Sequence, residues 1–176
     1  HIISALIAIP TLLFNWGNLK NISAREWFAI LFIGVCGSAL AAVAFTESFH
    51  YVNPSVSIVL QKIQPLIAIA LAWWMLGERM HKNFWMWAVV ALGAAYLVSF
   101  PNLVPQLYAG EVFNPNLIGS LLALTAAALW GASTVFGKYV LRTAAFQTLT
   151  SLRFIVGLIF LIVLNAAQGT FPAPGV

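Results

Sequence analysis

Apolar residues run along the chain in six long segments, and short polar segments separate them. The apolar segments cover residues 1–14, 27–45, 56–76, 84–100, 117–137 and 144–164. A helix of about 20 apolar residues crosses a hydrocarbon core about 30 Å thick, because each residue adds about 1.5 Å to its length. The pattern predicts an all-α, polytopic membrane helix bundle with six spans in this chain, the first of them cut at His1.

The segment 56–76 differs from the others because polar residues lie near the centre of one predicted helix. These residues are Gln61, Lys62, Gln64 and Pro65. A lysine at membrane depth costs about 2.5–3.5 kcal/mol on insertion scales, so it normally faces protein or a water-filled cavity. Pro65 has no N–H for the carbonyl of Gln61, which leaves that acceptor free. We therefore predict that these four residues contact a substrate.

Each of these polar residues also has a purely structural interpretation. The long stem of Lys62 could let its ammonium snorkel to the membrane interface. Gln61 and Gln64 could hold helices together through side-chain hydrogen bonds. On a helical wheel Lys62 points about 100° away from Gln61, so the two need not meet the same ligand.

Three polar or aromatic residues stand out in the later segments. We take Trp130 and Ser133, in the segment 117–137, as further candidate substrate contacts, with plain packing as the alternative for Trp130. Arg153 lies near the predicted cytoplasmic third of the last segment. We expect it to anchor at the lipid headgroups.

Composition supports a membrane protein and gives no sign of an enzyme. The chain of 176 residues is 62% hydrophobic and 7% charged, which is too little polar surface to cover a soluble globule. Four acidic residues, none inside a predicted span, leave no carboxylate pair for acid–base catalysis. No zinc-ligand spacing or Gly-rich phosphate loop is present. We expect no enzymatic activity, no cofactor and no metal.

The formal net charge of +4 does not indicate a nucleic-acid partner, because the charges lie between the apolar segments. With strictly alternating spans, six loop cations fall on one side, namely Lys20, Arg25, Arg79, Lys82, Lys138 and Arg142. The positive-inside rule makes this side cytoplasmic. Most tryptophans, Trp85 and Trp87 among them, also collect there as expected interfacial anchors. Residues 101–116 contain three prolines and no basic residue, so we predict an extracytoplasmic linker in a multi-pass protein of the cytoplasmic (inner) membrane.

Small residues recur at four-residue steps on two segments. One set is Gly34, Ser38 and Ala42, and the other is Gly119, Ala123, Ala127 and Gly131. Small side chains at this spacing allow two membrane helices to approach closely. We expect both faces to pack on other helices.

The order of the charges favours an inverted repeat. The segment that ends at Phe14 is followed by its positive loop, whereas the segment that starts at Ala144 is preceded by its own. If the two helices are equivalent, they cross the membrane in opposite senses. A five-helix unit repeated in tandem would produce that inversion.

Several short motifs resemble those of the EamA-domain transporters of the drug/metabolite transporter superfamily, over nearly the whole chain. The second part of one EamA unit is matched by Asn53-Pro54-Ser55, Pro65-Leu66, Leu76-Gly77-Glu78 and the helix around Gly93. The opening of the next unit is matched by Trp130, Gly131, Lys138 and Leu152-Arg153-Phe154. Lys62 departs from the small or apolar residue that is usual at its place.

The resemblance implies ten helices in two inverted halves of five, with both ends cytoplasmic and a central pathway for small metabolites. On that alignment residues 1–100 hold the end of helix 2 and helices 3–5 of the first repeat. Residues 101–116 are the linker, and residues 117–176 hold helices 6 and 7, which open the second repeat.

Together these observations predict a secondary transporter or exporter of small metabolites, amino-acid-like or other small organic solutes, that works by alternating access. Its partners would be a small-molecule substrate and the lipid bilayer. Proton or ion coupling and the oligomeric state stay open. The alternative is a non-transporting membrane subunit whose small-residue faces bind other helices and whose buried polar groups specify the pairing.

Overall fold

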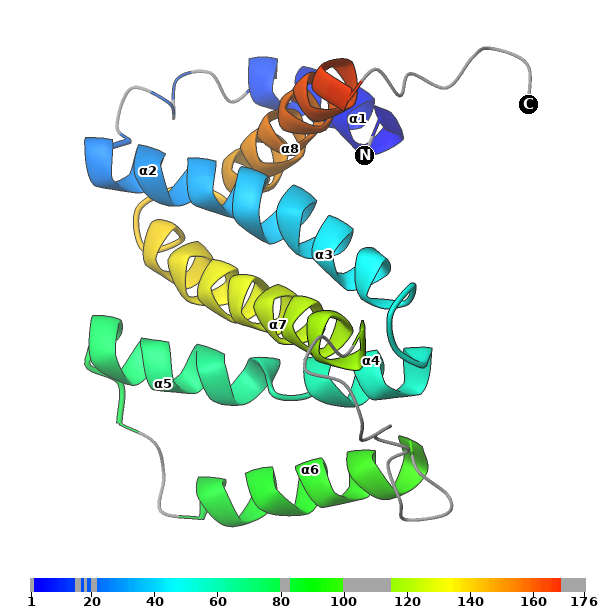
Figure 1. Ribbon diagram of the computed structural model, residues 1–176. Coiled ribbons are helices and arrows are strands. Elements are labelled where there is room, and N and C mark those ends of the chain that lie inside the picture. The colour runs from blue at the N-terminus through cyan, green and yellow to red at the C-terminus, as the bar shows by residue number, and fades with distance from the viewer. Residues whose placement is uncertain are drawn as a thin grey trace. The chain divides into compact units, whose positions relative to one another are not determined.

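The computed structural model describes residues 2–14, 17, 19, 22–79, 83–99 and 115–168. Its helices, in chain order, are α1 (Ile2–Phe14), α2 (Ala24–Phe32), η2 (Ile33–Leu40), α3 (Ala41–Ser48), α4 (Pro54–Gln61), α5 (Gln64–Leu76), α6 (Phe84–Ser99), α7 (Pro115–Val140) and α8 (Phe146–Gln168) (Figure 1). Over these ranges the chain contains helices and no strands, which confirms the predicted all-α membrane bundle. The linker proposed for residues 101–116 lies almost wholly outside the described residues.

Within the residues that the structure describes, four helical stretches are long and apolar enough to cross a membrane. They are Ala24–Ser48, Pro54–Leu76, Leu117–Val140 and Phe146–Ala167. The other two predicted segments are also helical where they are described, but α1 has 13 residues and the apolar part of α6 is short. The apolar segments therefore predict where the described helices lie, and four stretches reach a membrane-spanning length within the described residues.

The chain divides into two compact units, which we describe separately. The first unit contains His1–Ala39 and Phe136–Val176, and the second contains Leu40–Val135. In the first unit α1 packs against α8, and both lie at the top of Figure 1. The apolar core of this unit is built from Ala29, Ile30, Ile33, Val140, Leu149 and Leu152, all fully or almost fully buried.

The start of α2 is fixed by a capping box in the first unit. Ser23 Oγ accepts a hydrogen bond from the Glu26 N–H, and the Glu26 carboxylate accepts one from the Ser23 N–H at 2.6 Å. These bonds satisfy backbone donors that the first helical turn leaves without partners. The hydroxyl of Thr143, in the turn before α8, also donates to the Glu26 carboxylate. The buried Glu26 thus joins the beginning of α2 to the turn that follows α7.

The segment η2 is π-helical, which the sequence pattern did not indicate. Ser38 Oγ donates to the carbonyl of Ile33, five residues earlier, at 3.1 Å. Gly34 meets α8 so closely that a Cβ added to it would lie 2.5 Å from Val156 Cγ1. The small-residue face of this segment is therefore used for helix packing, as predicted for Gly34.

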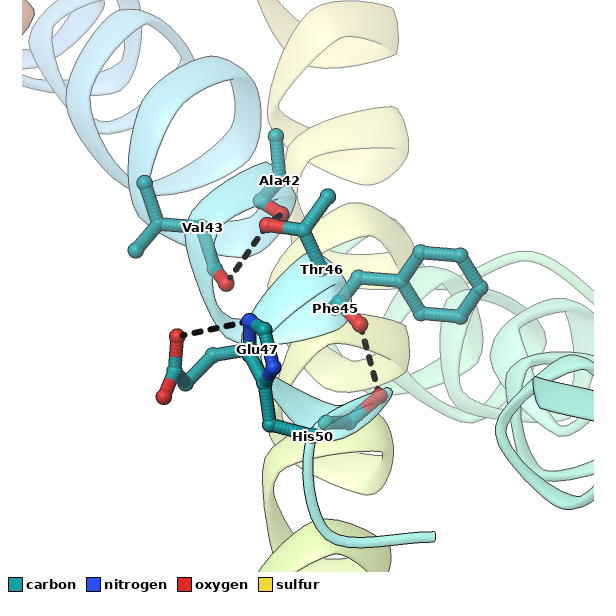
Figure 2. A network of polar contacts seen from close by, with 7 residues as sticks. Ala42, Val43, Phe45, Thr46, Glu47 and His50 are labelled. Carbon is teal, nitrogen blue, oxygen red and sulfur yellow. Dashed lines mark hydrogen bonds and ion pairs between the residues drawn. The ribbon is translucent and has the colours of Figure 1, made fainter. Parts of the chain in front are cut away.

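In the second unit the end of α3 is held by short-range polar contacts. Thr46 Oγ1 donates to the carbonyls of Ala42 and Val43, at 2.9 and 3.0 Å (Figure 2). The hydroxyls of Ser48 and Ser57 lie 2.8 Å apart and both residues are fully buried. This contact pairs the last turn of α3 with α4.

The small residues of α7 pack as predicted. Ala123 and Ala127 are fully buried, and Gly119 and Gly131 are buried at the two ends of the same stripe. A Cβ on Gly119 would lie 2.8 Å from Tyr51 Cβ, in the turn before α4. These small residues therefore let α7 approach the backbone and side chains of its own unit at van der Waals distance.

Candidate functional site

The polar middle of the span Pro54–Leu76 is a break between two helices. α4 ends at Gln61, α5 begins at Gln64, and Lys62 and Ile63 form a turn between them (Figure 1). The N–H of Lys62 bonds to the carbonyl of Val59 at 3.0 Å, a three-residue step that tightens the end of α4. The predicted membrane-spanning segment is present over Pro54–Leu76, with a tightened turn at Lys62 and Ile63 in place of regular α-helix at its middle.

Pro65 gives the physical reason for the break. A proline inside a helix removes one backbone hydrogen bond and clashes with the carbonyl four residues earlier, here that of Gln61. Proline is well tolerated in the first turn of a helix, where its missing N–H would have no partner in any case. The chain restarts its helix so that Pro65 occupies that first turn.

Two of the short motifs noted in the sequence cap the two ends of this span. Asn53 Oδ1 accepts the N–H of Ser55 at 2.9 Å and Pro54 stands at the first helical position, so the motif starts α4. Gly77 ends α5 in the left-handed conformation, with φ of 67°, and its N–H bonds to the carbonyl of Ala72. This is the usual role of a glycine after a helix. The motifs therefore fix the two ends of the span.

A pocket of about 320 Å³ opens beside the break. It is lined by Lys62, Pro65 and Leu66 at the break and by Phe84, Trp87, Ala88 and Leu92 of α6. α6 packs against α4 in the same unit. Among the described residues that line the pocket, Lys62 alone carries a charge. The wall is otherwise apolar and partly aromatic.

The two glutamines do not line this pocket. Gln61 and Gln64 are half-buried, and within the described part of the chain their side-chain amides make no hydrogen bond. Both interpretations of these amides, helix pairing and substrate contact, stay predictions. Of the four candidates in this span, the pocket brings together Lys62 and Pro65.

Trp130 and Ser133 lie on α7, away from the lining of the pocket. The ring of Trp130 packs on Phe45 with centroids 5.3 Å apart, which fits the packing alternative. Ser133 is 8% exposed, and its hydroxyl has no hydrogen-bond partner among the described residues. Between them, Gly131 lies so close to α5 that a Cβ would be 3.0 Å from the Gln64 carbonyl oxygen. The backbone at the break and the backbone of α7 are thus in direct contact.

Arg153, which was predicted to anchor at the headgroups, makes a contact that the sequence did not indicate. Its Nε donates to Ser38 Oγ at 2.6 Å, and the residue is half-buried in the first unit. Gly157, one turn further along α8, has its Cβ position 3.2 Å from the carbonyl oxygen of Gly34. The cation is therefore part of a helix–helix contact within a membrane-spanning stretch.

Two exposed titratable side chains lie near the end of α3. Glu47 and His50 are exposed neighbours on one turn, with Oε2 and Nε2 4.0 Å apart (Figure 2). The described residues hold no group of His, Cys, Asp and Glu side chains that could bind a metal ion.

Sequence reasoning missed the contribution of α6 to the pocket. Trp87 was assigned as an interfacial anchor, and Phe84 was given no role. Phe84, Ala88 and Leu92 recur at four-residue steps and so share one face of a helix. That spacing indicates a helix face that packs against another helix, but it does not identify which helix.

Comparisons with known proteins place these features in a family. The model of the EamA-like transporter family matches residues 1–100 and 117–175. The chain is 31% identical over 142 residues to a protein of Fusobacterium nucleatum subsp. nucleatum named riboflavin transporter ImpX, covering 79% of this chain and 46% of that protein. It is 26% identical over 148 residues to solute carrier family 35 member F2 of Xenopus tropicalis, covering 81% of this chain and 37% of that protein. No solved structure matches.

The chain thus spans less than half the length of the curated relatives it matches. The family match nevertheless covers nearly every residue of the chain outside 101–116. It includes both caps of the broken span and the helix break itself. This chain belongs to the EamA-like transporter family.

Proposed function

We propose that this protein is part of a secondary transporter or exporter of small organic solutes that works by alternating access across the cytoplasmic membrane. The observation that carries the proposal is the break in the span Pro54–Leu76, where Lys62 and Pro65 line a pocket of about 320 Å³. Family membership supports a membrane transporter of small solutes. The architecture we propose for the whole protein is ten helices in two inverted halves of five.

Lys62 and Ile63 keep right-handed helical dihedral angles, and their N–H groups bond to carbonyls three residues earlier, so the junction is a short 3₁₀ turn inside the span. A 3₁₀ stretch in the middle of a helix often marks a functional hinge. Lys62 and Ile63 are also the kind of helix-terminal residues that absorb dihedral changes when a segment moves. In this proposal α4 and α5 change their relative direction at this turn as the pathway opens to one side and then to the other. Substrate bound beside the turn would then be carried between the two openings.

The lining of the pocket suggests a class of substrate. Phe84 and Trp87 offer aromatic surface, and Lys62 offers one ammonium. This combination suits a small solute with a flat or apolar body and an anionic or hydrogen-bond-accepting group, including amino-acid-like compounds. Because one relative is named a riboflavin transporter, riboflavin is the first compound to test.

Gln61, Gln64, Trp130 and Ser133 remain proposed substrate contacts outside this pocket. The side chains of both glutamines are half-buried, and the buried hydroxyl of Ser133 has no hydrogen-bond partner among the described residues. A buried polar group without a partner is rare and costly. A substrate or ordered water could satisfy Ser133.

The test is uptake by proteoliposomes that contain the full-length protein, for riboflavin and a panel of amino acids and aromatic acids. Lys62→Met keeps the length of the stem and removes the charge. We expect it to insert normally and to raise the KM about five- to 150-fold, which corresponds to losing a hydrogen bond from a charged group of about 1–3 kcal/mol. Gln64→Leu should act in the same direction but more weakly.

Arg142→Met is the control, because it removes one positive charge from an exposed turn outside the pocket. Wild-type affinity and rate in both Lys62→Met and Gln64→Leu would contradict the proposed site. No saturable uptake of any compound, with a stable and correctly inserted protein, would favour the alternative of a membrane assembly subunit. That alternative is weakened by the small-residue faces, since Gly34, Gly119 and Gly131 already pack within this chain.

A further inference from the structure

A second pocket lies at the other end of α5. Its volume is about 580 Å³, and its lining residues are Ile69, Ala70 and Trp73 of α5, Arg79 just after α5, and Trp85 in the first turn of α6. None of these residues lines the pocket at the helix break. All of them belong to the second unit. The proposed transport function gives this pocket no role.

The end of α5 places a cation beside this pocket. Gly77 closes the helix in the left-handed conformation, and the N–H of Glu78 bonds back to the carbonyl of Ala72 at 3.4 Å. The chain therefore leaves the helix axis at once, and Arg79 follows two residues after the cap. Within the described residues the guanidinium of Arg79 makes no ion pair. The neighbouring Glu78 is half-buried and has a contact of its own.

The position of Arg79 along the chain corresponds to the headgroup layer. The apolar span ends at Leu76, three residues before Arg79. Three residues cover at most about 11 Å of extended chain, which is within the polar layer that borders the hydrocarbon core. Trp73 and Trp85 are 64% and 54% exposed. Indole rings favour this layer because one edge is polar and the body is apolar.

The pocket therefore combines two chemistries that one ligand must satisfy. A guanidinium binds phosphate oxygens through paired N–H groups. Ile69 and Ala70, with the two indoles, offer apolar surface that a hydrated inorganic anion cannot use. A phospholipid carries both a phosphate and a hydrocarbon chain. A zwitterionic headgroup carries its own cation, which offsets the attraction to Arg79, whereas an anionic headgroup does not.

We propose that the pocket formed by α5, Arg79 and Trp85 binds an anionic phospholipid, with the phosphate on Arg79 and an acyl chain along Ile69, Ala70 and the two indoles. The lipid stabilises the end of α5 against the start of α6. It fills a place that the small-solute site at the helix break does not share. The inference does not depend on which solute the protein transports.

The test uses the purified full-length protein in nanodiscs of phosphatidylcholine. Phosphatidylglycerol with brominated acyl chains is added in rising mole fraction, and quenching of tryptophan fluorescence is recorded. Brominated phosphatidylcholine is the reference lipid. We expect half-maximal quenching at a mole fraction about fivefold lower for phosphatidylglycerol, the preference that one surface cation provides.

Two matched pairs of variants locate the effect. Arg79→Gln should abolish the preference for phosphatidylglycerol, whereas Arg142→Gln, which removes the same charge from an exposed turn, should keep it. The double variant Trp73→Leu/Trp85→Leu should remove most of the phosphatidylglycerol-specific quenching, because both indoles line the pocket, whereas Trp74→Leu should keep it, because Trp74 lies outside the lining.

Equal quenching by the two lipids in the wild-type protein would overturn the proposal, as would an unchanged preference in Arg79→Gln. Inorganic phosphate and glycerophosphoglycerol distinguish a lipid from a soluble anion. We expect neither to displace the brominated lipid, and full displacement by either would overturn the lipid assignment. Circular dichroism of each variant excludes misfolding as the cause of a lost preference.

Discussion

Arg153 Nε lies 2.6 Å from Ser38 Oγ, and this hydrogen bond joins α8 to the π-helical segment η2. The same hydroxyl lies 3.1 Å from the carbonyl oxygen of Ile33. Ser38 can therefore accept from the guanidinium while it donates to the backbone. A single small side chain connects a cation within a membrane-spanning stretch to the helix beside it.

Removing that acceptor should destabilise the protein. Ser38→Ala leaves the Arg153 Nε–H without its partner, so we expect a loss between about 0.6 kcal/mol, the mean for hydrogen bonds between membrane helices, and about 3 kcal/mol, the upper range for charged groups in water. Thermal unfolding of the purified protein in detergent measures the change. Thr134→Ala is the control, since that exposed hydroxyl bonds only to its own helix at Trp130. Additive effects of Ser38→Ala and Arg153→Met in a double-mutant cycle would show that the contact contributes nothing.

Gly131 should tolerate no large side chain. Its Cβ position lies 3.0 Å from the Gln64 carbonyl oxygen and 3.2 Å from the Ala68 nitrogen, both backbone atoms that cannot rotate away. We expect Gly131→Leu to cost about 1–3 kcal/mol or more, because overpacking must separate α7 from α5. Gly137→Leu on the same helix meets nothing within 4 Å and should be near neutral. Equal melting temperatures for the two variants would contradict this packing.

The left-handed cap of α5 predicts a graded series at Gly77. Gly77→Ala places a Cβ in a conformation that costs about 1–2 kcal/mol for ordinary residues. Gly77→Asn should cost clearly less, because asparagine visits this conformation more readily. The wild type should therefore have the highest melting temperature, Gly77→Asn an intermediate one and Gly77→Ala the lowest. An Ala variant as stable as the wild type would mean that the cap has a different conformation.

Pro65→Ala tests whether the break is a moving part. The new N–H can bond to the Gln61 carbonyl and extend a single helix through the turn. If motion at this turn limits transport, kcat should fall while substrate affinity changes little. Uptake rates and equilibrium binding in the full-length protein separate the two quantities. A variant with normal kcat and weaker binding would assign Pro65 to substrate contact alone.

The predicted orientation can be tested with single cysteines in a Cys36-free background. A cysteine at Gln106 should react with an impermeant maleimide in whole cells, and one at Asn83 should not, because the six loop cations define the cytoplasmic side. Disruption of the cells should make Asn83→Cys reactive. The reverse pattern in intact cells would contradict the orientation, and with it the inverted repeat.

The sequence predicts the helices of this protein well because a membrane requires long apolar segments and penalises exposed backbone. The stripe from Gly119 to Gly131 was also readable, since small residues at helical spacing have one common use. The break at Lys62 was only half anticipated. Pro65 indicated that one backbone hydrogen bond is missing. The sequence did not show that α4 would end before the proline and that α5 would begin with the proline in its first turn.

Long-range partners were not readable from the chain. Ser38 and Arg153 are 115 positions apart, and Glu26 and Thr143 are 117 apart. Each of these residues has several equally good partners until the helices are paired. The π-helical turns of η2 left no recognisable local pattern either, because they consist of the same small and apolar residues as the flanking α-helix.

The two half-helices of the broken span also bear on charge selectivity. A helix carries a partial negative charge at its C-terminal end and a partial positive charge at its N-terminal end. At the break, the negative end of α4 and the positive end of α5 are separated by only Lys62 and Ile63. These two partial charges are opposite in sign and close together, so their electric fields largely cancel beyond the turn. The backbone therefore favours neither anionic nor cationic solutes. In the proposed transporter the preferred charge of the solute is then set by one ammonium, and we expect Lys62→Met to shift the preference from anionic to neutral solutes in uptake measurements.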